Sequence, residues 1–377
     1  MKTAFLFFAA LLTGSVLYGR SVSVTVINPD PSASRTEILE IPWKQVLKRE
    51  AFPDTSRIVV VDAHERSVPF QFIREGGQKI QSILFPVRVS PGGKTVYRIR
   101  YGTPESFTGR VYGRFVPERK DDFAWENDRI AFRVYGPALE ATGEVSNGID
   151  LWVKRTSEMV IDKWYRNDLT GTASYHTDHG EGMDFYNVGR TLGAGALAPY
   201  AADSLWLGRN FVTYEVLDSG PLRFTFRLIY APFRVGNDTV TETRTISLDA
   251  GEQFNRIGVR FEMTAPHMSV AAGVVVRNRA GERLESSAQR GYAAYAEPEA
   301  EEKGVLYTAV VSPKGFRRVL SASGHLLATD VYKRGTEYLY YSGGGWSKGG
   351  FPSAEDWFRY VANFADRLRH PLKVKIR

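Results

Sequence analysis

Residues 174–195, SYHTDHGEGMDFYNVGRTLGAG, concentrate side chains that can carry protons. In an extended chain alternate residues share a face, so His176 and Asp178 would point one way and Tyr175 and His179 the other. A histidine exchanges protons at neutral pH, and a neighbouring carboxylate fixes its tautomer. The glycines let the backbone turn, so we expect a strand end that runs into a loop on a rigid β scaffold. The predicted catalytic residues are Tyr175, His176, Asp178, His179, Glu181 and Asp184.

The same stretch contains nitrogen and oxygen ligands for a metal ion. Its two histidines are spaced H-x-x-H, without a helix or a paired distant ligand, and this spacing matches no metal-binding signature. A polar turn whose side chains satisfy one another is the structural alternative. We therefore predict proton transfer rather than a metal site, and no cofactor. A divalent cation would find ligands here, but the spacing does not support one.

A second group of candidates lies in residues 118–129, ERKDDFAWENDR. Carbohydrate sites commonly pair aromatic faces, which stack on sugar C–H surfaces, with carboxylates and amides that bind hydroxyls. The alternative is a turn at Asn127 and Asp128 that leads into a strand. The predicted substrate-binding residues of this segment are Asp122, Trp125, Glu126 and Asn127.

A third group places basic residues beside aromatic rings in residues 151–166. Arginine binds a carboxylate in a two-pronged fashion, which suits a sugar bearing a carboxylate or sulfate. An amphipathic segment with a charged face is the alternative. The stretch 342–350, SGGGWSKGG, lacks the spacing of a phosphate loop and predicts a flexible loop that carries a tryptophan. The further substrate-binding candidates are Lys154, Arg155, Arg190 and Trp346.

Strands must position most of these groups. Short β-branched runs between Pro, Gly, Asn and Asp turns predict a small N-terminal β-sandwich domain over residues 20–103. Alternating runs continue from residue 130 to residue 341. They predict a large antiparallel β domain, which we assign to residues 112–377 and which would carry the site.

Two helices are predicted. Ser353 and Asp356 resemble a capping box, and an apolar stripe from Trp357 to Leu368 follows. Pro371 ends this helix, and residues 372–376 are predicted as a last strand. A second helix is expected over roughly residues 150–164.

The N-terminus and the composition indicate where the protein acts. Residues 1–19 have the pattern of a secretory signal peptide, with a charged start, a short apolar core and small residues near the cut. The apolar run is too short to span a bilayer, so no membrane span is expected. The chain has no cysteine, so it cannot be a lipoprotein and thiol catalysis is excluded. We predict a periplasmic or secreted protein.

The net charge of +7 favours acidic partners, although a solvated basic surface would give the same value. Nucleic acid is not expected outside the cytoplasm, so the predicted partner is an acidic oligosaccharide or polysaccharide. The sequence lacks the G-x-S-x-G, H-E-x-x-H and dinucleotide-binding motifs.

Three stretches together resemble the exported bacterial family called domain of unknown function 4861: ERKDDFAWENDRIAFRVYGPAL, DKWY and SYHTDHGEGMDFYNVGRTLGAGALAPY. The segment TVTETRTISLDAGEQFNRIGVRFE is similar to a strand pair of galactose-mutarotase-like proteins. The resemblance implies an all-β fold, a galactose-mutarotase-like antiparallel β super-sandwich, and a role in polysaccharide breakdown. It assigns no catalytic residue.

The leading hypothesis is an exported carbohydrate-active enzyme that acts on uronic-acid-containing saccharides by lyase-like acid–base chemistry. Tyr175, His176 or His179 would move protons, and Arg190, Arg155 or Asn127 would neutralise the uronate carboxylate. A hydrolase would need two carboxylates across the bond. A non-catalytic glycan-binding protein and a mutarotase- or epimerase-like enzyme fit the same residues, because a fold alone does not choose among these functions.

Overall fold

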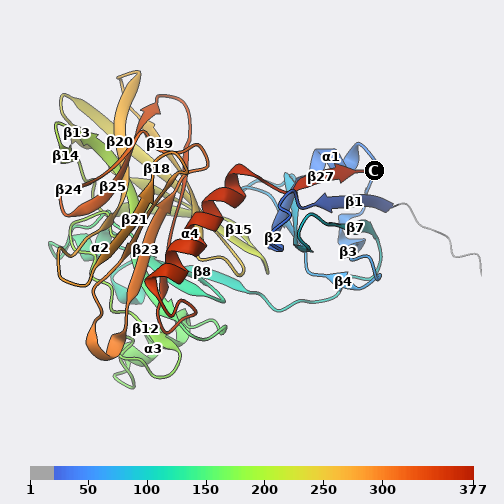
Figure 1. The fold of residues 1–377 in the computed structure, drawn as a ribbon, viewed down its shortest axis with the longest axis horizontal. Coiled ribbons are helices and arrows are strands. Elements are labelled where there is room, and N and C mark those ends of the chain that lie inside the picture. Colours follow the sequence, from blue (N-terminus) through green and yellow to red (C-terminus); the bar gives the residue numbers. More distant parts are fainter. Residues whose placement is uncertain (1–20) are drawn as a thin grey trace, which may run out of the picture.

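The computed structural model describes residues 21–377 and consists mainly of antiparallel strands. The predicted signal peptide lies outside the described residues. Figure 1 shows a small sandwich beside a larger layered domain, with one long helix between them. This arrangement confirms the predicted all-β super-sandwich with a small N-terminal β-sandwich and a C-terminal helix.

The small sandwich is made of two sheets. One sheet has the order β27-β1-β7-β3-β4 and the other β2-β6-β5. In β1 the side chains of Val22, Val24 and Val26 are fully buried between the sheets, because alternate residues of a strand face opposite sides. The strands are β1 (Ser21–Ile27), β2 (Arg35–Pro42), β3 (Ile58–Val61), β4 (Ser67–Val68), β5 (Gln71–Ile73), β6 (Ser82–Val89), β7 (Lys94–Tyr101) and β27 (Lys373–Ile376).

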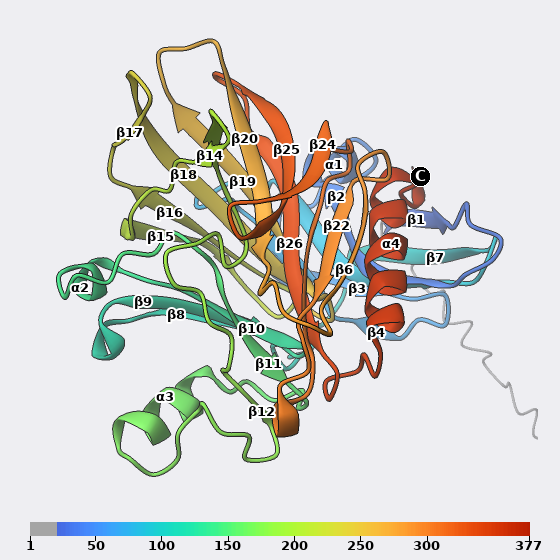
Figure 2. The same cartoon turned by 60° about the vertical axis from the view of Figure 1, so that its left-hand side comes forward.

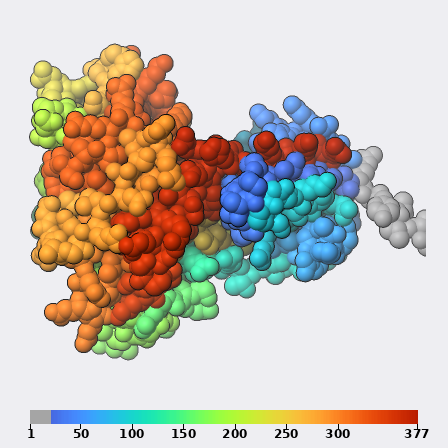
Figure 3. Space-filling view, in the orientation of Figure 1, coloured from blue at the N-terminus to red at the C-terminus, as the bar shows by residue number. Residues whose placement is uncertain are grey.

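The C-terminal strand differs from the expected division of the chain. The sequence places residues 372–376 in the large domain, but β27 pairs antiparallel with β1, so that Thr25 lies opposite Lys375. Figure 3 shows the red C-terminal residues along the blue N-terminal strands. The small sandwich therefore contains both ends of the described chain. Long-range pairing of this kind leaves no local signal in the sequence.

In the large domain, one long sheet packs against two shorter sheets. Residues from all three sheets form a single apolar core. The long sheet has the order β15-β16-β18-β19-β26-β23-β22-β21, with β17 beside β18. Its strands are β15 (Phe211–Ser219), β16 (Arg223–Tyr230), β17 (Phe233–Val235), β18 (Asp238–Asp249), β19 (Phe254–Glu262), β21 (Arg283–Ser287), β22 (Tyr292–Ala296), β23 (Leu306–Val311) and β26 (Tyr338–Trp346).

The first short sheet, β12-β11-β10-β9-β8, positions the candidate site, and Figure 2 shows its strands as a layer between the long sheet and the helix α3 (Ile161–Leu169). Its strands are β8 (Val111–Val116), β9 (Asp122–Asn127), β10 (Ile130–Val134), β11 (Asp150–Lys154) and β12 (Gly182–Met183). The second short sheet contains β13 (Ala194–Ala201), β14 (Ser204–Leu205), β20 (His267–Val275), β24 (Arg318–Ala322) and β25 (His325–Lys333).

The predicted C-terminal helix is confirmed as α4 (Ala354–Arg369). The Ser353 hydroxyl accepts a hydrogen bond from the Asp356 backbone N–H, which caps the first turn. The apolar stripe packs on the outer face of the long sheet, where the ring centroids of Phe364 and Phe254 lie 4.4 Å apart. The remaining helical turns are α1 (Trp43–Leu47), α2 (Pro137–Glu140), η1 (Thr55–Arg57), η2 (Pro117–Arg119) and η3 (Glu301–Lys303).

The second predicted helix is wrong in its placement. Residues 150–154 form β11, and the helix α3 spans Ile161–Leu169. Leu151 and Val153 face the shared core while Trp152 faces the other side of the sheet, so the alternation of a strand prevails over local helix propensity. Within residues 21–377, no helix is both long enough and apolar enough to cross a bilayer.

Gln71 joins the two domains. Its buried side chain accepts hydrogen bonds from the backbone N–H groups of Leu222 (3.0 Å) and Arg223 (2.8 Å) and donates one to the Arg223 carbonyl (2.9 Å). At Gly220 a Cβ atom would lie 2.4 Å from Gln71 Cδ, so only glycine fits beside this contact.

We expect Gln71→Ala to lower the free energy of unfolding by roughly 1–3 kcal/mol, because it leaves buried backbone N–H groups without a partner. Urea denaturation of the full chain measures this change. Gln78→Ala, which removes an exposed glutamine from the same domain, is the matched control. Equal stability of the two variants would contradict the role of Gln71.

Candidate functional site

The histidine stretch runs over the outer face of the first short sheet, next to α3. An aromatic layer lies between them: the ring of Trp152 in β11 stacks on Tyr175 at 5.0 Å and on Trp164 at 5.7 Å. Tyr165 packs edge-on against Trp152 at 5.1 Å. These rings are buried and anchor the stretch to the sheet.

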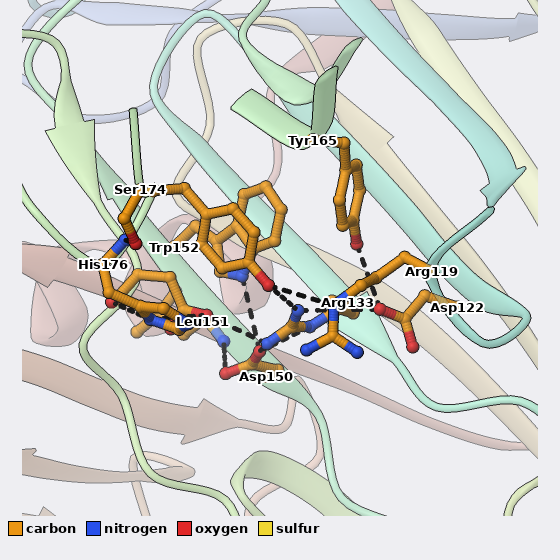
Figure 4. Close-up of polar contacts among 11 residues, drawn as sticks. Arg119, Asp122, Arg133, Asp150, Leu151, Trp152, Tyr165, Ser174 and His176 are labelled. Atoms are coloured by element: carbon orange, nitrogen blue, oxygen red, sulfur yellow. Dashed lines mark hydrogen bonds and ion pairs between the residues drawn. The ribbon is translucent and has the colours of Figure 1, made fainter. Parts of the chain in front are cut away.

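Arg133 lies at the centre of the site. Its buried guanidinium contacts the carboxylates of Asp150 (2.6 Å) and Asp184 (2.9 Å), and that of Asp122 at 3.6 Å. Arg133 is the direct cross-strand partner of Asp150, so the antiparallel register of β10 and β11 itself creates this pair. Figure 4 shows Arg133 between Asp150 and Asp122, with Arg119 beside it.

Two carboxylates of this cluster, Asp122 and Asp184, hold protons more tightly than ordinary carboxylates. Burial raises the pKa of Asp122 from 3.8 to about 6, although the nearby guanidinium groups of Arg133 and Arg119 oppose the shift. Burial, with repulsion from Asp150, also raises the pKa of Asp184 well above its ordinary value. Burial penalises the ionised form of Asp122 by more than the two guanidinium groups favour it, so this carboxyl group binds a proton in mildly acidic solution.

A cleft of about 500 Å³ opens above Arg133, and we call it the arginine cleft. Three cationic side chains on its wall, Arg119, Lys120 and Arg190, have no carboxylate partner in the described part of the chain. The cleft is lined by Arg119, Lys120, Arg133, Tyr135, Leu139, Glu144, Val145, Ser146, Tyr186, Asn187, Val188, Gly189 and Arg190.

Tyr186 lines this cleft, and Tyr175, which is not among the lining residues, contacts two arginines that are. The Tyr175 oxygen accepts hydrogen bonds from Arg119 Nε (3.3 Å) and Arg133 Nη1 (3.2 Å), so its own O–H remains free to donate. The Tyr186 hydroxyl is buried and has no hydrogen-bond partner among residues 21–377. Burial raises the pKa of Tyr186 well above 10, so its hydroxyl stays protonated and is a hydrogen-bond donor.

Among the predicted catalytic residues, Tyr175, His176 and Asp184 meet at the Arg133 cluster. The exposed ring of His176 places Nδ1 2.9 Å from the Asp184 carbonyl oxygen. A carbonyl oxygen only accepts, so Nδ1 carries the hydrogen and Nε2 keeps a lone pair for a proton.

Asp178, His179 and Glu181 instead make hydrogen bonds and ion pairs that stabilise the loop in which they lie. Asp178 accepts hydrogen bonds from the N–H groups of Gly180 and Gly182, and its carboxylate lies 2.9 Å from Arg155. Glu181 forms an ion pair with Lys163, and His179 contacts a backbone carbonyl through Nε2. None of the six predicted catalytic residues is among the residues that line the arginine cleft, but Tyr175 and Asp184 contact Arg133, which is.

The charged and amide groups predicted to bind substrate are largely internal. Lys154 and Glu126 form a fully buried ion pair at 2.6 Å, and Glu126 also accepts from the first N–H groups of α3. Asn127 donates to the carbonyls of Asp249 and Glu252. These contacts connect neighbouring strands and loops inside the protein. They use most of the hydrogen-bonding groups of Lys154, Glu126 and Asn127, so few remain to bind a sugar.

The two tryptophans predicted as stacking platforms are core residues. Trp125 is 0% and Trp346 1% exposed, and their indole N–H groups donate to Asn255 and to the Lys303 carbonyl. Their ring faces are covered by protein, which corrects the expected platform role. Of the predicted substrate-binding residues, Arg190 lies on the arginine cleft, Asp122 lies in the cluster below it, and Arg155 lies on the loop beside Asp178.

Sequence reasoning missed five residues of the site: Arg119, Arg133, Tyr135, Asp150 and Tyr186. The alternation in IAFRVY contains a usable signal, because Arg133 must face away from the core-facing Phe132. Its partner Asp150 becomes visible only once the register of β10 and β11 is known.

Comparison with known proteins identifies the family. A family model described as "Domain of unknown function (DUF4861)" matches residues 26–374. The chain belongs to the DUF4861 family. This membership confirms the resemblance found in the sequence. The chain is also 32% identical over 315 residues to "Uncharacterized protein P7" of Formosa agariphila, covering 78% of each chain.

Two solved structures from Enterococcus faecalis align with this chain. A protein in the glycosyl hydrolase family 38 aligns with a TM-score of 0.53 and 10% identity, over 95% of this chain and 47% of that one. An alpha-mannosidase aligns with a TM-score of 0.46 and 8% identity, over 95% of this chain and 46% of that one. The chain spans about half the length of these structures, and the first likeness shows a shared fold alone.

Within residues 21–377, no group of three or more His, Asp or Glu side chains is placed to hold a metal ion. Asp178, Glu181 and Asp184 are each engaged by cations or N–H donors, as described above.

The raised pKa of Asp122 predicts a specific pH dependence of stability. The folded protein binds more protons than the unfolded chain between about pH 4 and about pH 6, so stability falls as pH rises through this window. We expect the wild type to lose roughly 2–3 kcal/mol relative to Asp122→Asn between these limits. Urea denaturation at both pH values measures the difference. Asp203→Asn, at an exposed site, is the control, and parallel pH profiles of wild type and Asp122→Asn would contradict the assignment.

Proposed function

We propose that this protein is an exported carbohydrate-active enzyme that acts on uronic-acid-containing oligo- or polysaccharides by acid–base chemistry. The observation that carries the proposal is the arginine cleft, whose lining combines Arg119, Lys120 and Arg190, which form no ion pair among the described residues, with the tyrosines Tyr135 and Tyr186. The signal-peptide pattern of residues 1–19 supports a periplasmic or secreted location.

The cleft has the charge that a uronate carboxylate requires. Arg119 and Arg190 come from separate segments and make no ion pair among the described residues. Arg119 uses its Nε–H to bind Tyr175, so its Nη groups and the guanidinium of Arg190 are the donors for a ligand. Arginine binds a carboxylate through two parallel N–H donors. Neutralising that carboxylate makes the neighbouring C5–H bond of the sugar more acidic, which is the first requirement of β-elimination.

The elimination itself needs a proton acceptor and a proton donor. The acceptor takes the C5 proton, the C4–O bond breaks as the C4=C5 bond forms, and the leaving oxygen takes a proton. His176 Nε2 has the free lone pair of an acceptor, and the Tyr175 hydroxyl has the free hydrogen of a donor. Both side chains contact the Arg133 cluster, so they share one rigid support.

A hydrolase of the same sugars is less well supported. Hydrolysis uses two carboxylates across the glycosidic bond. Glu144 is the one carboxylate among the described residues that line the cleft, and the three aspartates below it are engaged by Arg133.

Non-catalytic glycan binding is the second candidate function. The engagement of Asp178, His179 and Glu181 in loop contacts favours it, because these groups are then not free for chemistry. A binding protein would use the same cleft cations without moving a proton.

The test is turnover of saturated uronate oligosaccharides by the mature chain, followed by the ultraviolet absorbance of the unsaturated product. We expect Tyr175→Phe and His176→Gln each to lower kcat/KM about 100-fold or more. Arg190→Ala should raise KM roughly tenfold to a hundredfold, since it removes charged hydrogen bonds to the carboxylate.

Matched controls keep this test specific. Tyr112→Phe removes a tyrosine hydroxyl that binds Asp162 outside the cleft, and Arg166→Ala removes an exposed arginine of α3. Both should retain activity. Full turnover by the Tyr175→Phe, His176→Gln double variant would overturn the assigned chemistry. Saturable binding of the oligosaccharide without any product would instead support a non-catalytic glycan-binding protein.

A further inference from the structure

The small sandwich displays six cationic side chains on one face of its β27-β1-β7 strands, and we call this surface the basic face. The sheet register places them together. Val22, Val24 and Val26 of β1 point into the core, so the intervening residues point outward. The basic face consists of Lys94, Arg98, Arg100, Lys373, Lys375 and Arg377.

Each strand contributes to this face in register. Thr25 lies opposite Lys375, and Ile27 lies between Lys94 and Lys373. Ser23 lies opposite Arg98, and on its other side its backbone exchanges two hydrogen bonds with Arg377. The two strands that flank β1 therefore carry the cations on one face, separated by the outward side chains of Ser23, Thr25 and Ile27.

Most of this charge is not neutralised by the protein. Glu65 is the carboxylate that pairs with Arg98 and Arg100. Lys94, Lys373, Lys375 and Arg377 are exposed, and none of them has an ion pair in residues 21–377. A cluster of unpaired cations on one face repels itself, and a polyanion relieves that repulsion.

The geometry suits a linear polyanion. Neighbouring strands lie about 4.8 Å apart, and side chains on one face of a strand repeat about every 7 Å. A chain with an anionic group on successive sugars can therefore meet several cations in turn, while Ser23 and Thr25 offer hydroxyls to the sugar. Val374 is the one exposed large apolar residue of these three strands, so little apolar surface is available for insertion into a bilayer.

We propose that the basic face binds an acidic polysaccharide chain, as a site separate from the arginine cleft. None of the six residues lines that cleft. The binding site rests on the sheet register and charge of the small sandwich, so it stands whether or not the cleft is catalytic.

The test is the affinity of the full mature chain for polygalacturonate at low ionic strength, measured by calorimetry. We expect the triple variant Lys94→Gln, Lys373→Gln, Lys375→Gln to bind at least tenfold more weakly. The matched control is Lys44→Gln, Lys48→Gln, Lys79→Gln, which removes the same charge from exposed lysines elsewhere in the small sandwich. It should bind within about twofold of the wild type. Raising the salt should weaken wild-type binding more than binding by the triple variant.

Three outcomes would overturn the proposal. Equal weakening by the two triple variants would show attraction to net charge alone. Equal or tighter binding to vesicles of anionic phospholipid, or to duplex DNA, would assign the face to a different partner. If the Lys94, Lys373, Lys375 variant binds polygalacturonate with unchanged affinity, the basic face is not a binding site. This conclusion holds even if turnover at the cleft is observed.

Discussion

The buried guanidinium of Arg133 is the interaction on which the site depends. It holds carboxylates from β9, β11 and the histidine stretch within 4 Å, so one side chain ties three segments together. Removing one partner of a buried charge pair usually costs about 3–5 kcal/mol, because the other charge is left uncompensated. The path of the chain from Tyr175 to Tyr186, and with it one wall of the arginine cleft, follows from this constraint.

The same constraint connects structure to chemistry. Burial, with repulsion from Asp150, raises the pKa of both Asp122 and Asp184, although Arg133 lies between them. Tyr175 is hydrogen-bonded by Arg133 from below and by Arg119 beside it, while His176 contacts Asp184 at the edge of the cluster. Tyr175, His176 and Arg119 thus share a single rigid support, which suits the proposed acid–base chemistry.

Local patterns in the sequence predict the elements that they encode. Alternation identifies the strands, and the capping residue Ser353 and the apolar stripe after it identify α4. Residue type alone does not report burial, so Trp125 and Trp346 resemble sugar platforms in the sequence although both fill the core. Strand register also has no local signal. Arg133 and Asp150 become partners, and β27 joins β1, only through pairings between distant segments.

The central claim is that the arginine cleft receives a uronate carboxylate. The most direct measurement is a crystal structure of the Tyr175→Phe variant with a saturated galacturonate oligosaccharide. We expect a sugar carboxylate within about 3 Å of the guanidinium of Arg119 or Arg190. An oligosaccharide bound elsewhere on the molecule, with the cleft free of sugar, would contradict it.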